Sequence, residues 1–258
     1  MPGKTLYCLG EAWLELNSTA PLASAKTFSP RMGGSAASLA LAYTSQGGRA
    51  SLLTQLGEDA FGHRIADALS TAGVDISRVC FTSRAPTPLL FDGGGETLAC
   101  RTRSSELLYA PEQLGADWAA EAEMLAFSSA CLVDSPCRYT HLAALDTART
   151  AGVPVCFVPS LRPALWPSEK TLRDTVMQFL PFADISQRCS RQIQRSRSIS
   201  GHRKSVMDHA SFLFPTTLNT SVHRVIISPG ILHLSGRIGH RFQNELFETG
   251  ISLITLYS

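Results

Sequence analysis

Residues 31–79 read RMGGSAASLALAYTSQGGRASLLTQLGEDAFGHRIADALSTAGVDISRV, and this stretch is the most informative one for the architecture. A glycine pair opens it. The small residues that follow predict a helix over 35–46, which a second glycine pair ends. The apolar run at 49–57 predicts a buried strand. A second helix is expected over 59–73, with an apolar face made of Phe61, Ile65, Ala68, Leu69 and Ala72. A strand between two glycine-closed helices is typical of a parallel α/β sheet.

The same alternation of strands and helices continues on both sides of that stretch. Upstream, residues 5–10 predict a first buried strand that continues into a more polar one, AWLELN. Downstream, residues 86–103 predict a hairpin around the turn DGGGE, which has to lie outside the main sheet. Further helices are expected over 111–125, 138–152 and 168–180, and strands over 125–129, 153–159 and from 182 onward. The pattern predicts an α/β fold, a parallel sheet flanked by helices with a small separate β layer.

Composition divides the chain into two unequal parts. The 258 residues are 44% hydrophobic, as in ordinary globular proteins. Residues 1–185 contain 14 Lys and Arg against 18 Asp and Glu, whereas residues 186–258 contain 9 against 3, together with five of the seven histidines. The regular pattern also fades after Ile185. We expect an α/β region over 1–185 and a basic tail over 186–258, with short strands indicated only in HRVIIS, GILHLS and ISLITLY.

The cysteines, the apolar runs and the basic segment of the sequence exclude several classes of protein. The seven cysteines are scattered and include no C-x-x-C pair, so neither a disulfide framework nor a metal site is expected. No stretch approaches the roughly 18 uninterrupted apolar residues of a membrane span. The first apolar run contains Glu11 and Glu15, unlike a signal peptide, so we expect a cytoplasmic protein. The basic segment 188–204 has no interleaved aromatic residues, and nucleic acid is not expected as a partner.

Several ordered motifs resemble the ribokinase-like, PfkB-type carbohydrate kinases, and fructokinases in particular. They are the glycine pair at 33–34, GEDAFG at 57–62, GVD at 73–75, and AGVPVCFVPSLRPALWPS at 151–168. The opening GEAWLEL is similar to the family's first strand. The similarity covers residues 5–185 nearly continuously. It implies a ribokinase-like parallel sheet flanked by helices with a small β lid, to which the hairpin at about 86–103 belongs.

The resemblance also implies a sugar-binding site. Glu15 stands where the family's first strand offers an Asp to the sugar hydroxyls, and Ser38 stands where an Asn follows the glycine pair. Each also has a purely structural interpretation: Glu15 as a solvent-facing strand residue, and Ser38 as a hydroxyl at the start of a helix. Arg101 and Arg103 on the hairpin could reach the sugar or a phosphoryl group, or only solubilise an edge strand. Arg162 is an anion-binding candidate or the partner of a structural carboxylate. The implied substrate-binding residues are Glu15, Gly33, Gly34, Ser38, Arg101, Arg103 and Arg162.

The catalytic part of the family pattern is missing. In these kinases a late G-A-G-D motif supplies the base and the start of an anion-binding helix, and no G-x-G-D occurs in this sequence. The family's D-P-N triplet reads Val158-Pro159-Ser160, and Gln192 stands where a Glu near the metal is expected. The family implies ATP and Mg²⁺ as cofactors, but no catalytic and no metal-binding residue is predicted in this chain.

Two functions from different classes follow from these observations. By resemblance the chain is an ATP-dependent, fructokinase-like sugar kinase, impaired by the missing motif. The alternative is a non-catalytic sugar-binding pseudo-kinase or a truncated product, because the similarity ends abruptly at Ile185, where the charge balance changes. A small sugar is the expected partner in both cases. The lid also allows a homodimer, or pairing with an intact kinase.

Overall fold

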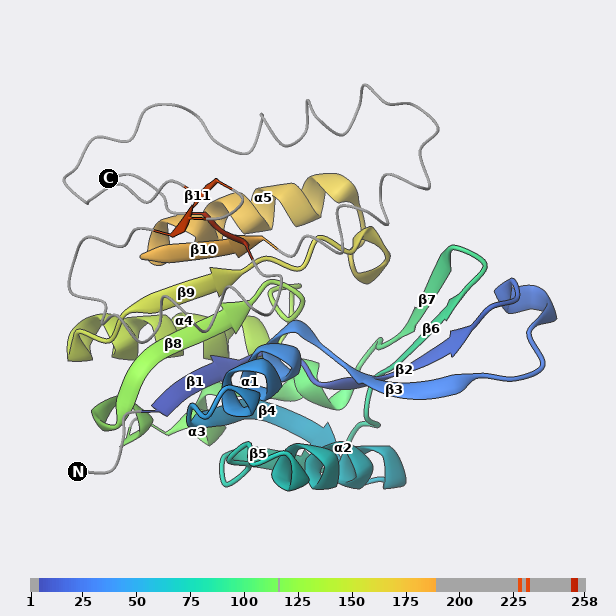
Figure 1. Ribbon diagram of the computed structural model, residues 1–258, viewed down its shortest axis with the longest axis horizontal. Helices are drawn as coiled ribbons and strands as arrows, with labels where there is room; N and C mark the ends of the chain where they lie inside the picture. The colour runs from blue at the N-terminus through green and yellow to red at the C-terminus, as the bar shows by residue number, and fades with distance from the viewer. Residues whose placement is uncertain (1–4, 116, 189–226, 229–230, 233–251, 255–258) are drawn as a thin grey trace.

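The computed structural model describes residues 5–115, 117–188, 227–228, 231–232 and 252–254. Its centre is a seven-stranded sheet with the order β13-β10-β9-β8-β1-β4-β5 (Figure 1). Six of the strands are parallel to one another, and β13 runs antiparallel to β10. The strands are β1 (Thr5–Leu9), β4 (Ala50–Gly57), β5 (Val79–Thr82), β8 (Ala122–Ser128), β9 (Val155–Val158), β10 (Ile185–Arg188) and β13 (Ser252–Ile254).

Helices cover both faces of this sheet because its central strands are apolar on both sides. Alternate residues of β1 show this: Cys8 belongs to one core cluster and Leu9 to the other. One cluster is completed by α1 (Ser35–Ser45) and α2 (Ala60–Thr71), and the other by α4 (Pro136–Ala151) and α5 (Glu169–Phe179). Cover on two faces is what parallel strands require. The predicted parallel sheet flanked by helices is confirmed.

Four further strands form a second sheet, with the order β3-β2-β6-β7. They are β2 (Trp13–Ser18), β3 (Ser29–Gly33), β6 (Leu89–Gly93) and β7 (Glu96–Cys100). β6 and β7 are the hairpin expected at 86–103. This sheet, the lid, projects from the main body beyond the end of β1 (Figure 1). Only three residues separate β1 from β2, so one short segment joins the main sheet to the lid.

The prediction of one long helix over residues 111–125 is wrong. Gly115 takes a φ of +66°, a left-handed conformation that ends α3 (Pro111–Leu114) after a single turn. A 3-10 turn at Asp117–Ala120 follows, and β8 already begins at Ala122. The apolar residues at its end, Ala122, Met124 and Leu125, are buried in β8, a central strand of the main sheet. A central strand gives such a run burial on both faces, which a helix on the surface of the sheet does not.

The apolar face expected for α2 is only partly confirmed. Three of its five residues are exposed, namely Phe61, Ala68 and Ala72. The cause is a close approach at the start of the helix, where a Cβ on Gly62 would lie 2.1 Å from the Gly57 carbonyl oxygen. The helix therefore presents its glycine to the end of β4, and this contact sets its rotation. The residues that it buries are Gly62, Ile65, Ala66 and Leu69.

Of the tail, the structure describes residues 186–188, which belong to β10, and three further short strands. β11 (Ile227–Ser228) pairs with β12 (Ile231–Leu232), and β13 pairs with β10. These positions agree with the three apolar runs that the sequence indicated. The rest of the predicted basic tail, with Gln192 and the segment 189–204, lies outside the described residues. Within the described part of the chain, no helix combines the length and the apolar character that a membrane span needs.

Gly34 provides a test of this architecture. It precedes α1 with a φ of +106°, and a Cβ there would lie 2.3 Å from the Glu11 carbonyl oxygen. We expect Gly34→Ala to lower the free energy of unfolding by about 3 kcal/mol or more, because strain and steric overlap add. Gly47→Ala is the control: its φ is +85° but no atom lies within 4 Å, so strain alone, about 1 kcal/mol, is expected. Equal losses for the two variants in chemical denaturation would contradict the predicted packing.

Candidate functional site

The carboxyl ends of β1, β8 and β9 lie at the edge of the main sheet that meets the lid (Figure 1). In open α/β sheets, ligands bind beside the carboxyl ends of the strands. Several side chains from distant parts of the sequence gather at this junction. We call it the lid corner and define it by Glu11, Trp13, Glu15, Arg101 and Arg162.

Glu15 lies at the centre of the lid corner, with a side chain that is only 2% exposed. Its Oε1 accepts a hydrogen bond from the Trp13 indole at 3.1 Å and lies 2.9 Å from Nη1 of Arg162. Its Oε2 accepts a hydrogen bond from Arg31. Burial alone would raise the pKa of this carboxyl group, but the charge of Arg162 and the hydrogen bonds from Arg31 and Trp13 together lower it. The carboxylate is therefore kept charged and buried, and the interpretation as a solvent-facing residue is wrong.

The contact between Arg162 and Glu15 is electrostatic rather than a hydrogen bond. Nη1 is close to the carboxylate, yet among the described residues it finds no acceptor in hydrogen-bonding geometry. The guanidinium also lies over the Trp13 ring, 5.9 Å from its centroid. Arg162 thus pairs with a carboxylate, as one of the two sequence interpretations proposed. It also retains N–H donors that a ligand at the lid corner can use.

The glycine pair Gly33 and Gly34 has a packing role. A Cβ on Gly33 would lie 2.4 Å from the Trp13 indole nitrogen and 2.6 Å from the Glu15 carboxyl group. A Cβ on Gly34 would meet the backbone at Glu11. Both glycines are therefore required by the protein's own groups. Their contact with a sugar stays a prediction.

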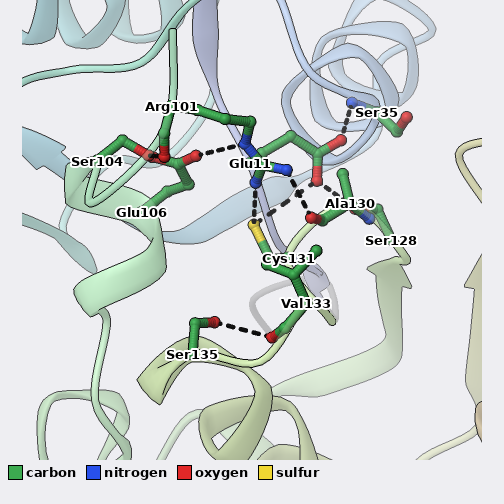
Figure 2. Close-up of polar contacts among 10 residues, drawn as sticks. All are labelled: Glu11, Ser35, Arg101, Ser104, Glu106, Ser128, Ala130, Cys131, Val133 and Ser135. Atoms are coloured by element: carbon green, nitrogen blue, oxygen red, sulfur yellow. Dashed lines mark hydrogen bonds and ion pairs between the residues drawn. The ribbon is translucent and has the colours of Figure 1, made fainter. Parts of the chain in front are cut away.

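Glu11 is the important residue that sequence reasoning missed (Figure 2). It is fully buried, and its Oε1 accepts the backbone N–H of Ser35, the first residue of α1, at 2.6 Å. Its Oε2 accepts the hydroxyl of Ser128, the last residue of β8. The Cys131 thiol lies 4.0 Å from the same oxygen. One carboxyl group thus joins the end of β1 to the start of α1 and the end of β8. Its position directly after a buried strand was the available signal.

Arg101 is buried at the base of the lid, on the opposite side of Glu11 from Ser35 (Figure 2). Its Nε donates to Glu106 Oε1 at 3.1 Å, and Nη1 donates to the Ala130 carbonyl at 2.9 Å. The guanidinium lies 5.7 Å from the centre of the Trp13 ring. Burial raises the pKa of Glu106, which the charge of Arg101 only partly offsets. The ion pair holds Arg101 against the 3-10 turn Ser105–Leu108, and the hydrogen bond to Ala130 fastens the end of β7 to the loop after β8.

The expectation that Arg101 and Arg103 both lie on a strand of the hairpin is wrong. β7 ends at Cys100, and Arg103 has a φ of +57° in an exposed turn. The chain therefore reverses between the two arginines, burying the first and exposing the second. Ser38 is exposed on α1. Contact of Ser38 or Arg103 with a substrate stays a prediction.

The chain matches the profile of the pfkB family carbohydrate kinases over residues 4–187. The chain belongs to the PfkB family. Fructokinase-2 of Solanum habrochaites is 34% identical over 169 residues, which cover 64% of this chain and 52% of that protein. Fructokinase-1 of Zea mays is 36% identical over 169 residues, with the same coverage. The chain thus spans about half the length of the curated relatives that it matches.

Solved structures agree with this assignment of the fold. The fructokinase of Xylella fastidiosa with bound ATP superimposes with a TM-score of 0.67 at 25% identity, covering 81% of this chain and 69% of that chain. The fructokinase of Halothermothrix orenii also gives 0.67, at 22% identity, covering 81% of this chain and 76% of its own. The PfkB fold of the described residues therefore rests on both sequence and structure.

The Arg101–Glu106 pair predicts a specific pattern of stability. Arg101→Met leaves Glu106 buried without its cation, and we expect the free energy of unfolding to fall by about 3–5 kcal/mol. Arg101→Met combined with Glu106→Leu should recover most of that loss, because no buried charge remains. Arg103→Met is the matched control and should change little, since that side chain is exposed. A double variant as unstable as the single one would show that the pair does not act as a unit.

Proposed function

We propose that the lid corner binds a small sugar, and that this chain binds it without efficient phosphoryl transfer. The supporting observation is the buried, charged carboxylate of Glu15, held between the lid and the carboxyl ends of the main strands. Hydrogen bonds from sugar hydroxyls to a charged carboxylate are stronger than those between neutral groups. Glu15 also occupies the position at which the resemblance places the family's sugar-binding acid.

The arrangement leaves a route for a sugar hydroxyl to reach Glu15. Arg31 has 58% of its side chain exposed, whereas Arg162 has 22%. Arg31 is the partner that water reaches, so its guanidinium can turn into solvent while a ligand hydroxyl takes its place at the buried carboxylate. Arg162 stays beside the carboxylate and offers its remaining N–H groups to the same ligand. The Glu15 carboxylate then accepts a hydrogen bond from one sugar hydroxyl, and the Arg162 guanidinium donates one to a neighbouring hydroxyl.

Phosphoryl transfer needs more than a sugar site. It requires a base for the hydroxyl proton, donors for the developing phosphate charge, and a held nucleotide with its metal. The G-x-G-D motif is absent from the sequence, and the end of β9 carries Val158 and Ser160 in place of an acid and an amide. The missing motif and the altered end of β9 support the non-catalytic alternative.

Pairing of two chains through the lid remains part of the proposal. Leu98 on β7 is 55% exposed, and β7 is an edge strand of the lid sheet. Exposed edge strands with apolar side chains favour pairing with another chain. The partner is a second copy or an intact kinase of the same family.

Isothermal titration of the purified chain with fructose, ribose and MgATP distinguishes a non-catalytic sugar-binding chain from an active sugar kinase. We expect sugar binding without nucleotide binding. Glu15→Gln should weaken the sugar affinity at least about tenfold, because a hydrogen bond to a charged group is lost. Glu96→Gln, an exposed carboxylate on the same lid sheet, is the matched control and should bind as the parent does. Nucleotide binding together with sugar phosphorylation would restore the kinase interpretation, and no sugar binding would reject the proposal.

A further inference from the structure

The motif GEDAFG at 57–62 contributes no residue to the lid corner, and in the structure it surrounds Thr87. Thr87 is buried and lies two positions before the lid strand β6. A Cβ on Gly57 would lie 2.5 Å from the Thr87 backbone nitrogen, and a Cβ on Gly62 would lie 2.8 Å from its Oγ1. The two glycines therefore leave the space that Thr87 fills. We call this arrangement the Thr87 socket and define it by Gly57, Asp59, Gly62 and Thr87.

The carboxylate of Asp59 joins two elements within the Thr87 socket. Its Oδ1 accepts the backbone N–H groups of Phe61 and Gly62, at 3.0 and 2.8 Å, and so caps α2. Its Oδ2 accepts the backbone N–H of Thr87 at 2.7 Å. The Thr87 hydroxyl accepts the N–H of Gly57, at the end of β4, at 3.0 Å. One oxygen is enough to cap a helix, so the second oxygen of Asp59 has a separate role, which is to hold the segment before β6.

The segment held by the socket leads directly to Glu15. The carbonyl of Pro88, the residue after Thr87, accepts the backbone N–H of Leu14 at 3.2 Å. From there β6 runs parallel to β2, and Leu90 is the register partner of Glu15. The backbone that carries the Glu15 carboxylate is thus hydrogen-bonded to the residues that follow Thr87. Where Thr87 lies therefore sets where Glu15 lies.

The far end of the lid hairpin is attached at the same place. Ser105 donates its backbone N–H to the Pro86 carbonyl at 2.9 Å, and its own carbonyl accepts from Nε2 of Gln55 at 2.9 Å. Gln55 is a buried residue of β4, two positions before Gly57. The two ends of the hairpin are therefore bonded to each other and to the end of β4. A shift of Thr87 moves the hairpin as a unit.

We propose that the Thr87 socket positions the lid, and that Asp59 is a positioning residue for the sugar site. This inference rests on the proposed function, because it takes the lid corner as the place where the sugar binds. Asp59 acts through Thr87 and Pro88 on the backbone of Leu14, and so on Glu15. A group that binds a ligand has to be held to within about 0.5 Å, which requires support of this kind from the residues behind it.

Asp59→Asn in the full chain tests the socket with a side chain of the same shape. Its one remaining oxygen can cap α2 or accept the Thr87 N–H, but not both, because the amide nitrogen is a donor. We expect fructose binding in isothermal titration to be about tenfold weaker, since a hydrogen bond to a charged group is lost. Without sugar, hydrogen–deuterium exchange in residues 13–18 and 87–93 should become faster.

Ser168→Ala is the matched control. It removes the hydroxyl that caps α5 by accepting the Thr171 N–H at 3.0 Å, and α5 contributes no residue to the lid corner. We expect a lower midpoint of chemical denaturation, with the fructose affinity and the exchange of the lid unchanged. The control thus distinguishes the loss of a helix cap from the loss of the contact with Thr87.

Thr87→Val breaks the same attachment from its other side, and it keeps the test valid if the Asp59 variant fails to fold. It retains the branched shape of the side chain but leaves the Gly57 N–H without its acceptor. We expect weaker fructose binding and faster exchange of the lid here too. The double variant should lose less affinity than the product of the two single losses, because both changes break one attachment.

Faster exchange that is confined to the lid supports the socket, and this readout involves no sugar. Unchanged exchange in the lid of both variants, or an equal increase in α4 and α5, would overturn the socket. Full fructose affinity in a variant with a loosened lid would overturn the positioning role of Asp59. If the parent chain binds no fructose, the proposed function fails and with it this role in sugar binding, whereas the exchange still decides whether the motif holds the lid.

Discussion

The Glu11 carboxyl group, buried where β1 passes into the lid, is the contact on which the rest of the described structure depends. A buried polar group must be hydrogen-bonded, and Glu11 meets this requirement through Ser35 at the start of α1 and Ser128 at the end of β8. Three elements that are distant in sequence are thereby fixed at one point. Because β2 begins two residues later, the same contact sets where the lid leaves the main sheet. The positions of Trp13 and Glu15 follow from it.

The lid corner combines two kinds of charged contact with different roles. Arg101 and Glu106 are both buried at the base of the lid, and Arg101 also donates to the Ala130 carbonyl in the loop after β8. Glu15 is buried as well, but one of its cationic partners, Arg31, is largely exposed. The first contact is therefore structural, whereas the second can exchange a protein partner for a ligand. A rigid attachment beside an exchangeable ion pair is a suitable arrangement for a sugar site under a lid.

The sequence predicted the alternation of strands and helices and the separate hairpin, and it singled out Glu15 and Arg162 as candidate site residues, since these inferences depend on local patterns and ordered motifs. It could not predict contacts between distant segments. Arg101 looked like a strand residue because nothing local marked the end of β7 at Cys100. The left-handed Gly115 was hidden inside an apparently helical run, so the start of β8 was missed. Glu11 appeared to be an ordinary polar residue, because its partners are 24 and 117 residues away.

The central claim is that the lid corner is the sugar site, and hydrogen–deuterium exchange with and without saturating fructose tests it most directly. The account predicts slower exchange in β2 (Trp13–Ser18) and in the segment 160–166 after β9, with no change in α5, which contributes no residue to the lid corner. Protection limited to other elements, or no protection at a fructose concentration that titration shows to be saturating, would contradict the claim.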